Sequence, residues 1–408
     1  MSMYWCICHE IDVRLWNVTS QSRLQRVFKK IGVNFLENIQ DLPSESSLFI
    51  VRGDYLFDDR VWLWLSKEKN RVLNITSHSR QIPVAAHVDS SHASLTWQGI
   101  ENGECSGIPN LQSMNLENLS LSFSNELRKS DHPYILPIRD ENKELLEGQL
   151  FAGSYKGVTD LVTKFLWPTS AKWVTRFCAL RGISPNQVTS ASLVFVFIAG
   201  FLFAYGYFAI GLVCGWGMTF LDTVDGKLAR VTVTSTKWGN IFDHGIDLIH
   251  PPLWYVVWGV GLLSFSPMLS WLTLAMTCWL IVIGYILGRI VEGIFQWGLA
   301  GFDIFCWKPF DSYFRLIVAR RNPSMIFLTG SVLIGRPDLG LEAVAIWTVL
   351  STFILLGRLA MAVLEKNMKG SLTSWLAEID PVNGRDSLAV RVFTNPSATM
   401  KGDGRREK

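Results

Sequence analysis

The chain has 408 residues, of which 49% are hydrophobic and 18% are charged, and its formal net charge is +3. It is too long for one ordinary domain, and its mean hydropathy of +0.23 is too high for a wholly soluble protein. The small charge excludes a dedicated nucleic-acid-binding protein, and the basic residues lie near the predicted membrane boundaries, where membrane lipids with anionic headgroups are the expected partners.

The first part of the chain, residues 1–150, is mixed and polar and is expected to form an α/β domain. Residues 20–31 have the spacing of an amphipathic helix, with Ser20 as its N-cap. Residues 47–51 are expected to form a buried strand that leads into Asp54 and Asp58. Acidic residues that follow the carboxyl end of a strand are usual ligand positions in α/β folds.

This half resembles a nucleotidyltransferase domain of the Rossmann type, such as the cytidylyltransferase fused to the phosphotransferase in bifunctional inositol-phosphate enzymes. Those enzymes begin with a glycine-rich loop, usually followed by Arg or Lys, that cradles the nucleoside triphosphate. Residues 1–14 supply no such loop. The resemblance therefore implies a degenerate Rossmann-like domain without cytidylyltransferase activity.

A second segment, residues 151–183, is predicted to lie along the membrane surface. Between Tyr155 and Leu180, apolar residues recur at helical spacing while lysines and arginines lie elsewhere, as in an interfacial amphipathic helix. The alternative is a soluble linker helix packed on the first domain. Trp167 and Pro168 are expected to divide the segment into two pieces.

Long apolar runs dominate residues 184–370 and predict an all-α bundle of six transmembrane helices. Ser184 and Pro185 form a favourable start for the first of them, as N-cap and first helical residue. Residues 371–408 follow as a cytoplasmic tail. The six spans are expected at about 187–206, 208–231, 238–263, 268–297, 324–336 and 342–365.

The basic residues between the spans predict the orientation. Loops on one side contain few lysines and arginines, whereas those on the other side contain many, among them Lys227, Lys237, Lys308 and Arg315. The positive-inside rule therefore predicts a multi-pass protein of the inner or plasma membrane, with the active site and both termini facing the cytoplasm.

Four carboxylates lie in the apolar sequence of the second and third spans, namely Asp222, Asp225, Asp243 and Asp247. A charge at bilayer depth costs about 3 kcal/mol even on lenient scales, so it marks a functional site by default. The spacings i, i+3 and i, i+4 place each pair on one helix face, and two facing helices would gather all four. Ligation by oxygen alone suits Mg²⁺ or Mn²⁺, which usually serve phosphates.

Around these carboxylates the sequence reads D-x-x-D-G-x-x-A-R, eight residues, then G-x-x-x-D-x-x-x-D. It resembles the signature of CDP-alcohol phosphotransferases at every specified position. Stray or salt-bridged charges are the alternative, which is disfavoured because basic partners are few and the segment is apolar. Besides the four carboxylates, the specified residues are Gly226, Ala229, Arg230 and Gly239.

The resemblance implies a membrane transferase that moves a phospho-alcohol group from a CDP-alcohol donor to a hydroxyl acceptor, a polar alcohol, an alcohol phosphate or a lipid, and releases CMP. It implies that Asp222, Asp225 and Asp243 hold one or two Mg²⁺ or Mn²⁺ ions. Asp247 is the candidate general base and a further metal ligand, and His244 is the second candidate for the base.

The resemblance also assigns the donor site. Gly226 and Ala229 leave room for the cytidine, and Arg230 contacts phosphate. Asn186 is expected to face the nucleotide phosphates, with Gly239 in the same site. Family members commonly pair through their membrane helices, so a homodimer is expected.

Three arginines are candidate ligands of the acceptor, each with an alternative. Arg289 either holds an anionic group or is neutralised by Glu292, three residues later. Arg320 and Arg321 either bind a phosphate of the acceptor or anchor the chain at the cytoplasmic surface. The first domain favours inositol-phosphate chemistry, whereas the triplet Asp-His-Gly at residue 243 favours amino-alcohol transferases, so donor and acceptor stay open.

A function of another class is a catalytically silent lipid-binding scaffold of the membrane, or an ion-coupled transporter whose ion site is the acidic cluster. Transporters often contain repeated halves with broken helices, and the sequence shows no such symmetry. The intact signature spacing favours the enzyme.

Overall fold

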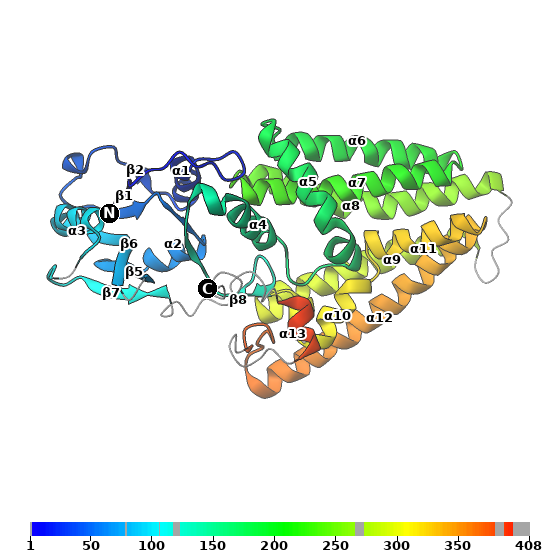
Figure 1. Cartoon of the computed structure of the whole chain (residues 1–408). Coiled ribbons are helices and arrows are strands. Elements are labelled where there is room, and N and C mark those ends of the chain that lie inside the picture. Colours follow the sequence, from blue (N-terminus) through cyan, green and yellow to red (C-terminus); the bar gives the residue numbers. More distant parts are fainter. Residues whose placement is uncertain are drawn as a thin grey trace, which may run out of the picture.

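The computed structural model describes residues 2–77, 80–105, 107–116, 123–265, 273–379 and 387–394. Within these ranges the side chains of Asn240, Asp243, His244 and Phe265 are outside the description. A part built on a β-sheet lies at one end of the molecule, and long helices extend away from it (Figure 1). The chain therefore combines a sheet-containing N-terminal part with a helical C-terminal part, as the sequence predicts.

Six strands form the N-terminal sheet in the order β2-β1-β3-β6-β5-β7. Strand β1 pairs in parallel with β2 and β3, whereas β6 runs antiparallel to β3 and β5, so the sheet is mixed. The strand predicted at 47–51 is confirmed as β3, while the Rossmann-like assignment stays a prediction. The bounds are β1 (Met3–Cys8), β2 (Asn34–Phe35), β3 (Ser47–Arg52), β5 (Arg71–Ser77), β6 (Arg80–Asp89) and β7 (Gln112–Asn115).

Helices cover both faces of this sheet because alternate strand residues point to opposite sides. Helices α1 (Ser20–Lys30) and α2 (Arg60–Leu65) pack on the face that carries Trp5 and Phe49, and α3 (Ser90–Asn102) packs on the other. The predicted first helix is confirmed, but its N-cap is Thr19 and not Ser20. The Thr19 hydroxyl accepts a hydrogen bond from the backbone N–H of Ser22. Ser20 cannot be the cap because it is already the first residue of the helix.

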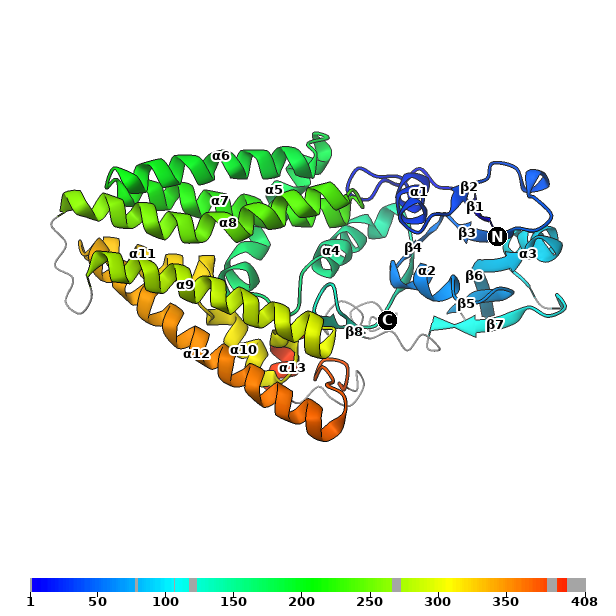
Figure 2. The ribbon, with the colours of Figure 1, turned by 180° about the vertical axis from the view of Figure 1, so that it is seen from behind.

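The helical part forms two groups that Figure 2 shows from behind, α6–α8 in one and α9, α11 and α12 in the other. Ser184 caps α6 and Pro185 begins it, as predicted. The chain reaches α6 through α4 (Lys143–Gly153), a π-helical turn at Val162–Leu166 and α5 (Trp167–Leu180). The turn continues into α5 without a break, so the predicted division into two pieces at Trp167 is wrong, and only the helix type changes there. The remaining bounds are α6 (Pro185–Ala204), α7 (Phe208–Val231), α8 (Lys237–Leu262), α9 (Leu274–Gly293), α10 (Pro309–Ile317), α11 (Arg321–Leu333), α12 (Pro337–Lys369) and α13 (Leu388–Phe393).

In the described part of the chain, four helices are long and apolar enough to cross a membrane, at Pro185–Ala204, Phe208–Val231, Leu274–Ala300 and Pro337–Lys369. Large apolar side chains point outward from them, such as Phe197, Val213 and Phe353, each about 70% exposed, as expected of surfaces that lipid covers. Helices α8 and α11 occupy the third and fifth predicted spans, although α11 has 13 residues. Residues 268–272 of the fourth predicted span lie outside the described residues, and the six-helix bundle stays a prediction.

The N-terminal part is attached at the carboxyl end of α7. Arg23 of α1 donates a hydrogen bond to the carbonyl of Val231 at 2.7 Å, and Arg26 donates to that of Thr232 at 2.6 Å. Basic groups at the end of a helix satisfy its last carbonyls and complement its dipole. Val233 is buried in the core of the N-terminal part. These contacts fix the end of α7 relative to the sheet.

Candidate active site

Carboxylates from α7 and α8 meet at one cavity of about 430 Å³, which Asp222 and Asp247 both line. Asp225 lies one turn further along α7 and is 3% exposed, and its carboxylate accepts a hydrogen bond from the hydroxyl of Thr189 on α6 at 2.6 Å. Asp222 and Asp247 are near enough for their negative charges to repel the carboxylate of Asp225. Asp243 and His244 belong to α8, but their side chains lie outside the described residues.

Arg321, at the start of α11, bridges the two helices. Its Nη2 lies 2.5 Å from Oδ2 of Asp222, and its Nη1 donates to Oδ1 of Asp247. Few basic residues accompany the acidic cluster in the sequence, and Arg321 is a basic partner that folding supplies from 99 residues beyond Asp222. The structure thus places Arg321 on the carboxylates, and its assignment to the acceptor stays a prediction.

The donor set of this cluster fits a divalent cation. Carboxylates from two helices converge on one positive charge, the guanidinium of Arg321, and all the candidate ligands are hard oxygens. In the described part of the chain no three acidic, histidine or cysteine side chains lie close enough to hold a metal ion, and the side chain of Asp243 was outside that search. That search included Asp222, Asp225 and Asp247, so the fit rests on the chemistry of their oxygens alone, and the metal site stays a prediction.

Three of the predicted donor-site residues, Gly226, Ala229 and Arg230, line the same cavity. A Cβ atom at position 226 would lie 3.0 Å from Nη2 of Arg230, so the glycine leaves room for that guanidinium. Arg230 also donates from Nε to the carbonyl of Ser154 at 2.8 Å. Signature residues of α7 thus hold a basic group beside the carboxylates.

Asn186 and Gly239 face each other, because a Cβ atom at position 239 would lie 3.0 Å from Oδ1 of Asn186. Asn186 is the second residue of α6 and Gly239 lies in the first turn of α8. The cavity lining includes neither residue. The structure brings this predicted pair together, outside the cavity.

The lining of the cavity is rich in arginine. Glu292 accepts from Nη2 of Arg289 at 2.5 Å and also pairs with Arg320, so the predicted neutralisation of Arg289 is present and includes a second guanidinium. Arg128, from the N-terminal part, pairs with Asp303 at 2.8 Å. The cavity therefore joins the signature carboxylates to a basic wall made by distant segments.

Arg315 of α10 also lines this wall and is 8% exposed. Within the described residues, its Nε and Nη1 have no hydrogen-bond partner. Burial raises the pKa of nearby Asp160, but the charge of Arg315 and hydrogen bonds from Thr163 and Asn322 outweigh it, so the net pKa lies below its ordinary value. Asp160 therefore stays ionised at neutral pH. Separately, the Nε and Nη1 donors of Arg315, which lack a partner among the described residues, could hydrogen-bond to an anion.

Sequence reasoning missed Arg128 and Arg315. Arg128 lies in a polar stretch without periodic signal, whereas Arg315 lies in a short amphipathic helix between two spans. A basic residue on the buried side of such a helix was the available signal for Arg315. No local signal marks Arg128, because only the docking of the N-terminal part brings it to the cavity.

The family model of CDP-alcohol phosphatidyltransferase matches residues 182–294. This segment contains α6, α7, α8 and α9, and hence both carboxylate pairs. The match confirms the family resemblance for this segment and supports transferase chemistry. The nucleotidyltransferase resemblance of the N-terminal part stays a prediction. No curated protein matches the chain.

Proposed function

We propose that this chain is a membrane-embedded transferase that moves a phospho-alcohol group from a CDP-linked donor to a hydroxyl acceptor and releases CMP. The observation that carries the proposal is that Asp222, Gly226, Arg230 and Asp247 of the family signature line one cavity together with several arginines. The family match supports a CDP-alcohol donor. The positive-inside pattern supports an active site open to the cytoplasm, and the homodimer stays a prediction.

In the proposed reaction the acceptor oxygen forms a bond to the phosphorus that carries the donor's alcohol. The bond from this phosphorus to the bridging pyrophosphate oxygen breaks, and CMP leaves with its electron pair. The proton of the acceptor hydroxyl passes to a carboxylate. Asp247 suits this role because its side chain is 40% exposed and lines the cavity, whereas Asp225 is buried against Thr189. His244 remains the second candidate.

Mg²⁺ or Mn²⁺, as one or two ions, would be held by Asp222, Asp225, Asp243 and Asp247. When bound, the metal would neutralise charge that develops on the leaving CMP phosphate. Arg321 pairs with two of these carboxylates, so it would compete with a metal ion for their negative charge. Arg230 lines the same cavity, and the proposal assigns it to a phosphate of the donor.

The basic wall favours an acceptor that carries an anionic group. Arg128, Arg289, Arg315 and Arg320 line it, and the two unpartnered donors of Arg315 suit a phosphate. An alcohol phosphate fits these groups better than a neutral lipid alcohol does. This proposal therefore places the predicted acceptor residues Arg289 and Arg320 beside the phosphate of the acceptor.

The test uses the purified full chain in detergent with a panel of CDP-alcohols and of acceptors with and without phosphate. CMP release is expected only with Mg²⁺ or Mn²⁺ and to be faster with phosphorylated acceptors. Turnover that survives exhaustive chelation would contradict the metal assignment. A chain that releases no CMP with any pair but still binds lipid or metal would instead be a silent scaffold or transporter.

A further inference from the structure

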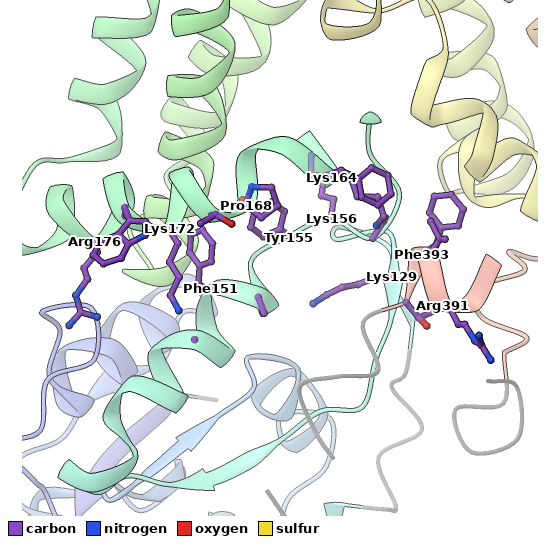
Figure 3. A pocket seen from close by; sticks show the side chains of 18 of the residues that line it. Lys129, Phe151, Tyr155, Lys156, Lys164, Pro168, Lys172, Arg176, Arg391 and Phe393 are labelled. Carbon is purple, nitrogen blue, oxygen red and sulfur yellow. The ribbon is translucent and has the colours of Figure 1, made fainter. Parts of the chain in front are cut away.

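A second cavity, of about 900 Å³, lies between α4, α5 and α13 (Figure 3). Glu144 is the one acidic residue among the described residues that line it. None of the described residues that line this cavity has a role in the reaction proposed above. Six basic residues line it, namely Lys129, Lys156, Lys164, Lys172, Arg176 and Arg391.

The positive charge of this groove is cancelled only in part. Lys129 pairs with Asp131 at 2.7 Å, and Arg176 pairs with Glu147. Lys164 donates instead to a backbone carbonyl, that of Gly157, at 2.8 Å, and burial lowers its pKa to about 8. An anion in the groove would therefore relieve desolvated positive charge.

The groove opens beside an apolar surface. Trp173, Phe177 and Leu180 of α5 recur at i, i+4 and i+7 and are 72%, 55% and 60% exposed. Phe165 and Leu166, just before α5, are also exposed, and Phe165 and Trp173 line the groove itself. Such a stripe on a helix beside basic groups is typical of segments that lie in the membrane interface. The surroundings thus suit a ligand with an anionic head and an apolar tail.

The segment at 155–165 separates the groove from the reaction cavity. Thr159, Asp160 and Thr163 face the reaction cavity, whereas Lys164 and Phe165 face the groove. Lys156 lines both. A ligand in the groove would therefore contact the back of one wall of the reaction cavity.

We propose that this groove binds an anionic phospholipid of the surrounding membrane, with the headgroup in the basic lining that includes Lys172 and Arg391 and the acyl chains along Trp173 and Phe177. The basic lining supplies the attraction for the phosphate, and the exposed stripe of α5 supplies the apolar surface for the chains. This inference goes beyond the proposed reaction and does not rest on it, because the groove is a separate cavity.

The experiment is native mass spectrometry of the full chain in detergent, titrated with phosphatidylglycerol and, separately, with neutral phosphatidylcholine. The variant is Lys172→Ala with Arg391→Ala, and the matched control is Lys29→Ala, an exposed lysine of α1. Both groove residues are exposed, so thermal unfolding of the double variant should match wild type. Each basic group near an anionic headgroup contributes about fivefold in affinity, so the double variant should bind phosphatidylglycerol about fivefold more weakly or worse.

Preference of the wild type for phosphatidylglycerol, lost in the double variant and kept in Lys29→Ala, supports the proposal. Equal binding of phosphatidylglycerol by the double variant and the wild type overturns it, as does equal binding of phosphatidylcholine. Displacement of the lipid by excess inorganic phosphate would assign the groove to a soluble phosphate compound and overturn the lipid assignment. The readout is binding alone, so failure of the transferase proposal leaves this test intact.

Discussion

Arg321 places its Nη2 2.5 Å from Oδ2 of Asp222, so a guanidinium of α11 contacts a signature carboxylate of α7. The same guanidinium contacts Asp247 of α8. Three helices therefore meet at one charge cluster. This arrangement leads to separate predictions for the carboxylates and for Arg321.

Removing a signature carboxylate should slow turnover greatly. Asp222→Asn and Asp225→Asn are each expected to lower the rate of CMP release by about 1,000-fold, because each loses charge that would hold the metal. The control is Glu365→Gln, which changes a carboxylate of α12 that pairs with Lys308 and Lys369. Near-normal CMP release by Asp222→Asn would contradict the site.

Removing Arg321 should make stability depend on a divalent cation. In Arg321→Gln, two partly buried carboxylates lose their partner, and we expect the free energy of unfolding to fall by about 2 kcal/mol. Added Mg²⁺ should then raise the melting temperature more in the variant than in wild type, as thermal unfolding in detergent would show. Equal shifts would mean that these carboxylates do not take up the metal.

Arg315 should act on acceptor binding. Arg315→Gln loses charge-assisted hydrogen bonds of about 2 kcal/mol, so KM for a phosphorylated acceptor should rise by about 30-fold with little change in kcat. Arg336→Gln is the control, because Arg336 pairs with Asp338 at the start of α12. Steady-state kinetics that show an unchanged KM, or the same effect on an unphosphorylated acceptor, would refute the role.

Lys164 should give stability a pH dependence. Burial lowers its pKa from 10.5 to about 8 in the folded chain. Between these values the unfolded chain binds more protons than the folded one, so the free energy of unfolding should rise with pH, by about 3 kcal/mol at most. Lys164→Met should lose this rise, whereas Lys29→Met should keep it. Denaturant unfolding across this pH range measures the difference, and parallel profiles for wild type and Lys164→Met would exclude it.

Arg23 should hold the two parts of the chain together. Arg23→Leu removes the hydrogen bond to the carbonyl of Val231 and leaves that carbonyl without this donor, at a cost of about 2 kcal/mol. We expect faster proteolysis between the N-terminal part and α7. Lys29→Leu, on the exposed side of the same helix, should be cleaved at the wild-type rate. Unchanged cleavage of Arg23→Leu would show that other contacts suffice.

Much of the local structure follows from the sequence because its causes are local. Ser184 and Pro185 start α6 as predicted, since a cap needs only the next few residues. At α1 the predicted cap, Ser20, is one position late, because Thr19 and Ser20 are adjacent hydroxyl residues that the local sequence does not distinguish. The strand at 47–51 was predictable because its apolar run has no other stable place than the core.

The sequence by itself determined the carboxylate pairs, because helix periodicity fixes which side chains share a face of their own helix. Only the tertiary structure decided that Arg321 contacts Asp222 and Asp247, and that Arg128 and Arg315 join the same cavity. These arginines come from segments far apart in the chain and follow no period. Their places depend on how whole helices pack and on where the N-terminal part docks, which no local pattern encodes.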